Sequence, residues 1–144
     1  MFCQSPRGTL SWLWKDLQIT GKAYRVPTRT GSIAELNLIT ERKVTVEDND
    51  AFRKAAAVPP LRGVMSVLED EWASSRILGD LHSSIVDLPL TAVQGELLSV
   101  AAWYDNEMGY SARLAEMAAQ ITSGKPIVQH EAYESAFANL LTEV

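Results

Sequence analysis

The segment WYDNEMGYSARL at residues 103–114 constrains the fold more than any other part of the chain. It begins like the end of a strand, continues as a turn and leads into a helix, which is predicted from about Asn106 to Ser123. Gly124 and Pro126 are typical of residues that end a helix. Apolar residues recur at spacings of four, three and four along one face of this helix: Tyr110, Leu114, Met117 and Ile121.

Four strands are also predicted. Residues 33–39 alternate apolar and polar side chains, the pattern of a half-buried strand in which Ala34, Leu36 and Leu38 share the core-facing side. Further strands are predicted at 61–68, 83–93 and 96–103. Gln94-Gly95 separates the last two by a tight turn, so this pair is predicted to be an antiparallel hairpin. Pro89 lacks an amide donor, and we expect a bulge or an edge position there.

A shorter helix is predicted at 46–57. Thr45 precedes it, and its hydroxyl can accept a hydrogen bond from the free amides of the first turn. Pro59 and Pro60 end the helix because proline cannot continue it. This order of elements predicts an α+β fold, a largely antiparallel sheet with helices packed on one face.

Composition excludes several classes of protein. The 13 basic and 18 acidic side chains give a net charge of -5 without a basic cluster, which argues against nucleic acid and anionic membranes as partners. Cys3 is the single cysteine, so an intramolecular disulfide and a thiolate zinc site are excluded. No apolar run approaches the roughly 20 residues of a membrane span, and no signal peptide is recognisable. We therefore expect a cytoplasmic protein.

Five motifs occur in one order along residues 20–114. They are GKAYRVPT at 21–28, VTVEDNDAFRKAAA at 44–57, LRGVMSVLEDEWASS at 61–75, HSSIVD at 82–87 and WYDNEMGYSARL at 103–114. In this order and spacing they resemble the C-terminal, catalytic domain of phosphorylating glyceraldehyde-3-phosphate dehydrogenase. The resemblance implies that family's fold and its NAD-dependent oxidation of an aldehyde to an acyl phosphate in glycolysis.

The resemblance implies roles for three residues. Arg25 matches the arginine of the family's R-V-P-T motif and is expected to bind the substrate phosphate, which a guanidinium can hold through two parallel hydrogen bonds. Asn106 matches the asparagine of W-Y-D-N-E and is expected to bind the nicotinamide carboxamide of NAD, since an amide both donates and accepts. Tyr110 is expected to line the site. Without the family, these residues would be a surface charge, a helix N-cap and a packing residue, respectively.

No residue is assigned a catalytic or metal-binding role. His82 and Ser83 have no carboxylate or thiol partner at a recognisable sequence spacing, and in the family this segment is structural. His130 lies beyond the resemblance and is expected to face solvent. The acidic run at 69–71 lacks regular metal-ligand spacing and is interpreted as a solvated loop.

The family's reaction needs two parts that these motifs do not supply. A cysteine thiolate activated by a histidine attacks the aldehyde, and an N-terminal domain binds NAD. Cys3 does not lie in the family's S-C-T-T-N-C motif, and no G-x-G-x-x-G opens a strand-turn-helix unit. We therefore expect a truncated chain that is inactive and does not bind NAD by itself. Its expected segments are unmatched residues 1–19, a partial catalytic domain at 20–125 and a C-terminal extension at 126–144.

Two alternatives for the function stay open. The chain can be a non-catalytic assembly module or half of a split enzyme, with a homo-oligomer or a complementing nucleotide-binding half as partner. It can also be similar to erythrose-4-phosphate dehydrogenase, because substrate selection depends largely on the missing half.

A second short helix is predicted at 130–141. Its apolar stripe consists of Tyr133, Phe137, Leu140 and Leu141. We interpret this helix first as one that packs onto its own domain and second as a partner-binding helix.

Overall fold

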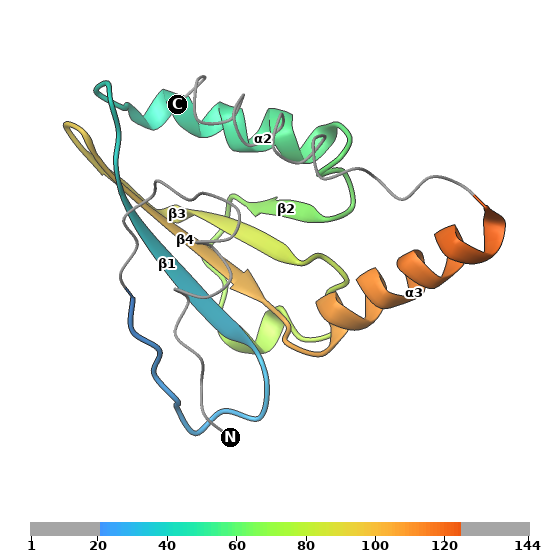
Figure 1. Cartoon of the computed structure of the whole chain (residues 1–144). Helices are drawn as coiled ribbons and strands as arrows, with labels where there is room; N and C mark the ends of the chain where they lie inside the picture. Colours follow the sequence, from blue (N-terminus) through green and yellow to red (C-terminus); the bar gives the residue numbers. More distant parts are fainter. Residues whose placement is uncertain (1–20, 125–144) are drawn as a thin grey trace.

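The computed structural model of the chain describes residues 21–124. They form a four-stranded sheet in the order β1-β4-β3-β2, with one helix across the sheet and another that projects from it (Figure 1). The elements are β1 (Ser32–Ile39), η1 (Val46–Asn49), α2 (Asp50–Ala57), β2 (Met65–Leu68), η2 (Ser74–Arg76), β3 (Ser84–Gln94), β4 (Leu97–Tyr104) and α3 (Met108–Ser123).

The β3–β4 hairpin has the turn that the sequence predicts. Gly95 has a φ of 66°, a backbone conformation that is costly for residues with a Cβ. The ladder then shifts register between Asp87 and Ala92, which confirms the bulge expected around Pro89. Because β2 pairs with β3 only as far as Asp87, no β2 ladder bond requires the missing amide of Pro89.

The outer strands make the sheet mixed but mostly antiparallel. β1 runs antiparallel to β4 along its whole length, whereas β2 runs parallel to β3. The predicted fold class is therefore confirmed. The prediction that one side of β1 faces the core is only partly right, because Leu38 packs against the core while Ala34 and Leu36 are exposed.

The main core lies where α2 crosses one face of the sheet (Figure 1). Ala51 and Phe52 face inward from α2, with exposed fractions of 5% and 6%. They belong to one cluster with buried apolar side chains from the strands and loops: Val44, Leu61, Met65, Val86, Leu88, Leu98 and Val100. Burial of this apolar surface is the main favourable contribution to folding.

The helix predicted at 46–57 is present as the 3-10 turn η1 followed by α2. The capping prediction for Thr45 is wrong, because its side chain accepts no hydrogen bond from the first turn. Instead, the Asp48 carboxylate accepts hydrogen bonds from the Thr45 backbone amide (2.7 Å) and hydroxyl (3.4 Å). A carboxylate one turn inside the helix thus reaches back to the residue before it, as in one half of a capping box.

A second, smaller core cluster is separate from the main one. Ile77 and Ile85 are almost completely buried there and pack with Leu68. Beside them, the buried Asp87 carboxylate accepts hydrogen bonds from the Trp103 indole (2.7 Å) and the Leu90 amide (3.1 Å). These donors offset part of the cost of burying a carboxylate.

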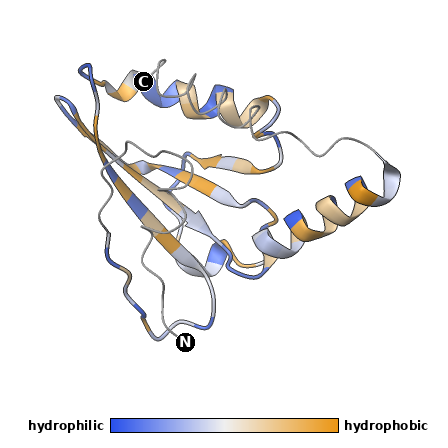
Figure 2. Ribbon diagram, viewed as in Figure 1, coloured by the Kyte–Doolittle hydropathy of each residue, from blue (hydrophilic) through white to orange (hydrophobic). Residues whose placement is uncertain are grey.

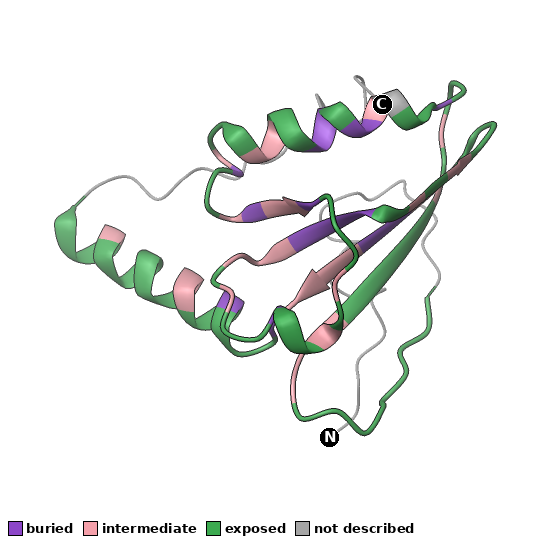
Figure 3. Cartoon of the chain, turned by 180° about the vertical axis from the view of Figure 1, so that it is seen from behind, coloured by how far each residue is buried: buried purple, intermediate pink, exposed green. Residues whose placement is uncertain are grey.

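Helix α3 leaves the end of β4 and projects away from the sheet. Seen from behind, α3 is exposed along most of its length, whereas α2 has buried residues along the side that faces the sheet (Figure 3). Apolar residues recur along α3 (Figure 2). The helix begins two residues later than predicted, and Gly124 ends it in the left-handed conformation, as expected.

Within residues 21–124, no helix is long and apolar enough to cross a membrane. Cys3, His130, the segments 1–19 and 126–144 and the helix predicted at 130–141 lie outside the described residues.

Candidate functional site

The turn between β4 and α3 is built around one buried carboxylate. Asp105 is 4% exposed and accepts hydrogen bonds from the backbone amides of Gly79 (2.9 Å), Glu107 (2.9 Å) and Met108 (3.0 Å). Met108 is the first residue of α3 and Glu107 directly precedes it, so Asp105 caps the start of this helix. The Gly79 amide comes from the loop before β3, and the same carboxylate therefore joins two separate segments.

These hydrogen bonds determine the charge state of Asp105. They lower the pKa of its carboxyl group, with the Gly79 amide contributing most and the Met108 amide next, against an opposing effect of burial. The carboxylate thus stays ionised at neutral pH, and its negative charge lies at the positive end of the α3 dipole.

Asn106 follows directly and lies on the surface of the turn. Its side-chain Oδ1 accepts a hydrogen bond from the Ser32 hydroxyl at 2.9 Å, and its side-chain nitrogen has no hydrogen-bond partner among residues 21–124. The structure does not support the alternative that Asn106 is the N-cap, because Asp105 makes the capping bonds. The Asn106 amide is therefore oriented by β1 and open to solvent.

A second contact connects the same turn to the start of β1. The Thr30 hydroxyl donates a hydrogen bond to the Glu107 carboxylate. Thr30 and Ser32 flank Gly31, whose φ of 87° permits the sharp turn into β1. Two hydroxyls from one segment thus hold two successive residues of another.

The structure does not bring Arg25 into contact with this turn. Arg25 is exposed and makes no hydrogen bond or ion pair within the part of the chain that the structure describes. It lies in the segment before Thr30, which has bends but no helix or strand, so the two positions are close in the sequence. Tyr110 lies in the first turn of α3 and is exposed.

The loop before β3 contains a hydrogen-bonded pair, Asp80 and His82, that the sequence motifs did not reveal. Asp80 Oδ1 lies 2.7 Å from His82 Nδ1 and also accepts a hydrogen bond from the His82 backbone amide at 2.8 Å. No carboxylate partner of His82 is recognised from sequence spacing, and the structure shows that Asp80, two residues before it, is one. The pair is a local turn motif in which an Asp side chain bonds the backbone two residues on, and this motif is recognisable at short range.

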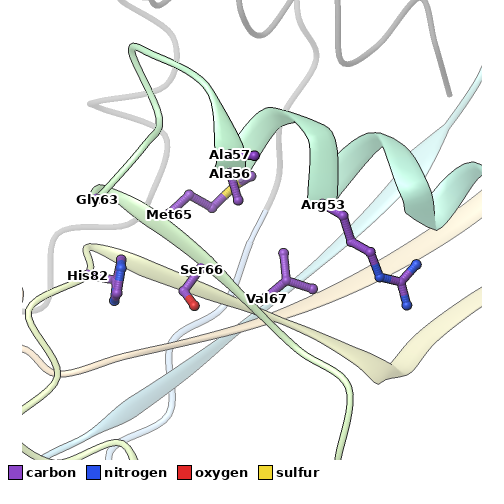
Figure 4. Close-up of a pocket in the computed structure, with 8 residues that line it drawn as sticks. All are labelled: Arg53, Ala56, Ala57, Gly63, Met65, Ser66, Val67 and His82. Atoms are coloured by element: carbon purple, nitrogen blue, oxygen red, sulfur yellow. The ribbon is translucent and has the colours of Figure 1, made fainter.

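His82 lies at one end of a shallow groove of about 330 Å³ between α2 and β2, and Arg53 lies at the other end (Figure 4). Ser66 also lines the groove, but no hydrogen bond joins its hydroxyl to His82 among the described residues. At the other end, Glu69 and Asp50 accept hydrogen bonds from the Arg53 guanidinium at 2.7 and 2.6 Å. Among the described residues that line it, the groove therefore has neither an activated nucleophile nor an unpaired cation.

Charged side chains do not form a metal site in residues 21–124, where no group of three or more His, Cys, Asp or Glu residues gathers. Glu69, in the acidic run, is exposed and pairs with Arg53, in agreement with a solvated loop.

Comparison with known proteins finds one family and several relatives that match much of this chain. Residues 13–106 match the family described as "Glyceraldehyde 3-phosphate dehydrogenase, C-terminal domain". The glyceraldehyde-3-phosphate dehydrogenase of Mycolicibacterium smegmatis is 42% identical over 104 residues, covering 72% of this chain and 31% of the relative. The protein of the same name from Kitasatospora aureofaciens is 47% identical over 102 residues (70% and 30%), and that from Geobacillus stearothermophilus is 39% identical over 107 residues (74% and 32%). The chain thus spans about a third of the length of these curated relatives.

Proposed function

The chain belongs to the glyceraldehyde-3-phosphate dehydrogenase family, and we propose from this premise that it carries the ligand-positioning part of an NAD-dependent, phosphorylating active site. In this proposal, Asn106 positions the nicotinamide and Arg25 binds the substrate phosphate. The observation that carries the proposal is the turn at Asp105, which presents the Asn106 amide beside a carboxylate that accepts three backbone hydrogen bonds.

The Asn106 side chain suits a carboxamide ligand. Its oxygen already accepts a hydrogen bond from Ser32, which restricts rotation of the amide, while its two N–H donors have no partner among the described residues. A carboxamide offers an oxygen acceptor to such donors. NAD supplies the hydride acceptor when bound.

Arg25 suits a phosphate for a complementary reason. The guanidinium is exposed and has no carboxylate partner within residues 21–124, so its charge is available to a ligand. A planar guanidinium can bind two phosphate oxygens at once.

The 144-residue chain alone does not complete the reaction in this proposal. The covalent step needs a thiolate next to a base. Residues 21–124 contain no cysteine, and Asp80 holds the Nδ1 side of His82. We expect that a nucleotide-binding partner must supply the nucleophile and the rest of the cofactor site.

Complementation tests this proposal. The chain is mixed with the separately produced part of the Geobacillus stearothermophilus relative that precedes its match, and NAD reduction is followed with glyceraldehyde 3-phosphate and phosphate. We expect reduction only in the mixture. Asn106→Ala should lower the rate about tenfold or more through loss of cofactor orientation, and Asn37→Ala, an exposed change on β1, should not.

The remaining outcomes have defined meanings. Reduction by the chain alone would show that the predicted inactivity is wrong. A mixture that forms a complex but shows equal rates for the parent and the Asn106→Ala variant would exclude the positioning role. Arg25→Gln should raise the KM for the sugar phosphate. Rates with erythrose 4-phosphate, measured in parallel, distinguish an activity on glyceraldehyde 3-phosphate from one on erythrose 4-phosphate.

A second candidate function, a non-catalytic assembly module, is favoured by the exposed apolar residues of β1. Ile33, Leu36 and Ile39 are exposed along a strand that pairs only with β4 among the described elements. Light scattering of the chain alone, and after mixing with a full-length relative, tests this function. A strictly monomeric chain that joins no relative would exclude it, whereas assembly that Leu36→Glu abolishes would support it.

A further inference from the structure

The apolar stripe of α3 has no cover within residues 21–124. Tyr110 is 69% exposed, Leu114 56%, Met117 42% and Ile121 64%. Among residues 21–124, the tertiary contacts of α3 lie at its base, where Gly109 packs against the His82 backbone and Arg113 donates hydrogen bonds to Ser83 Oγ (3.1 Å) and Leu81 O (3.4 Å). Four large apolar side chains in line on a projecting helix favour a specific apolar partner.

We propose that residues 127–144 of the same chain are this partner and that Tyr133, Phe137 and Leu140 pack against the α3 stripe as an antiparallel helical hairpin. The proposal does not depend on the proposed function.

The spacing of the two segments supports this pairing. The stripe on α3 advances by four, three and four residues, and Tyr133, Phe137 and Leu140 are spaced by four and three. Steps of four and three place side chains on one seam, where two helices can interlock. A segment of 12 residues, such as 130–141, is about 18 Å long as a helix, which matches a stripe that extends over a similar length of α3.

The end of α3 supports the same direction. Gly124 has a φ of 66° and donates a backbone hydrogen bond to Ile121 O at 3.4 Å, so the helix stops directly beside the last residue of the stripe. Pro126 follows in the sequence and cannot continue the helix. A chain that reverses here reaches the stripe through a short connection, which is the usual form of two antiparallel helices.

Covalent connection favours the tail over a second copy of the chain. A segment joined by a short linker has an effective concentration in the millimolar range at the neighbouring surface. A separate molecule at micromolar concentration must pay the full cost of association for the same contact. The tethered tail is therefore favoured over a second copy as the occupant of the stripe.

Hydroxyl-radical footprinting with mass spectrometry tests the contact in the full chain. We expect labelling of Tyr110, Leu114 and Met117 to rise several-fold in a Tyr133→Ser/Phe137→Ser/Leu140→Ser variant. A control variant with Glu131→Ser, Glu134→Ser and Asn139→Ser changes three polar residues of the same tail and should label like the parent. Equal labelling in the parent and the apolar variant, both folded by circular dichroism, would overturn the proposal.

A disulfide trap keeps the test decisive if the triple variant does not fold. In a Cys3→Ser background, Met117→Cys with Phe137→Cys should form an intramolecular disulfide on mild oxidation. Ala119→Cys with Phe137→Cys places the first thiol on the opposite side of α3 and should not. Two results would identify a second copy as the occupant and overturn the proposal. One is a disulfide between two chains. The other is a molecular mass that doubles as the protein concentration rises, together with protection of Met117 from labelling.

Discussion

The two α-helices of the described chain have opposite surroundings. α2 buries Ala51 and Phe52 against the sheet, whereas α3 exposes Tyr110, Leu114, Met117 and Ile121. Both helices are amphipathic, so the difference lies in where the neighbouring loops carry them. The loop before η1 returns α2 to the face of the sheet, and the turn at Asp105 directs α3 away from it. An apolar helix face in the sequence therefore indicates that another surface should cover it. The loops that connect the helix to the sheet decide whether the sheet is that surface.

The largest expected effect is at the buried side of this comparison. Phe52→Ala should lower the free energy of unfolding by about 3–5 kcal/mol, because it removes a buried aromatic side chain and leaves a cavity. Val58→Ala, at an exposed position just beyond α2, is the control and should change it by less than about 0.5 kcal/mol. Urea denaturation of residues 1–144 measures both. Similar losses for the two variants would mean that α2 does not pack as described.

The turn that directs α3 should show the next largest effect. Asp105→Ala removes the acceptor for three backbone amides and should destabilise the chain by about 2 kcal/mol. Asp80→Ala is the matched control in the neighbouring loop, where the carboxylate bonds only within its own turn. Hydrogen exchange should show faster opening of the first turn of α3 in Asp105→Ala only. Unchanged exchange there would contradict the capping role.

Gly109 tests how closely the base of α3 packs. A Cβ at this position would lie 2.9 Å from the His82 carbonyl oxygen, so α3 must shift to accommodate it. The resulting strain should exceed the gain in helix propensity, and we expect Gly109→Ala to destabilise the chain by about 1 kcal/mol. Ser111→Ala, an exposed change two residues later, should be neutral or slightly stabilising. Thermal unfolding of the two variants separates a close contact from a general effect of alanine in the helix.

The smallest predicted effect is a pH dependence. Because the folded structure lowers the pKa of Asp105, its contribution to stability is complete above the ordinary carboxyl value of about 3.9 and is lost as the pH falls through the lower folded-state value. Stability measured from pH 7 downwards should therefore fall less steeply below about pH 4 in Asp105→Asn than in the parent. Parallel curves would show that another group dominates the acid transition.

Much of the fold is predictable from local signals. The hairpin follows from Gly95, the bulge from Pro89 and the helix ends from Pro59 and Gly124, because each residue restricts the backbone at its own position. Which side chains of β1 face the core is less predictable. Leu36 belongs to an alternating apolar set, yet its exposure depends on which distant elements cover the strand.

The candidate site shows the same limit. Asn106 and Arg25 are found from sequence motifs, and their proposed roles stay predictions. The partners of the turn are not accessible in this way: Gly79 lies 26 residues from Asp105, and Ser32 lies 74 residues from Asn106. Such contacts form only when the sheet assembles. The Asp80 and His82 pair, two residues apart, is the exception that a local turn motif could have revealed.

The pairing of β1 with β4 has a consequence for the order of folding. β3 and β4 are joined by a tight turn, whereas β1 pairs with β4 across a long loop, as shown by the hydrogen bond between Ser99 and Glu35, 64 residues apart. Closing a long loop costs more chain entropy than closing a hairpin, so the hairpin should nucleate first and β1 should join late. Pulse-labelling during refolding should protect amides of the hairpin before those of β1. Until β1 joins, the outer edge of β4 would be unpaired, and we expect aggregation during refolding to start from this edge.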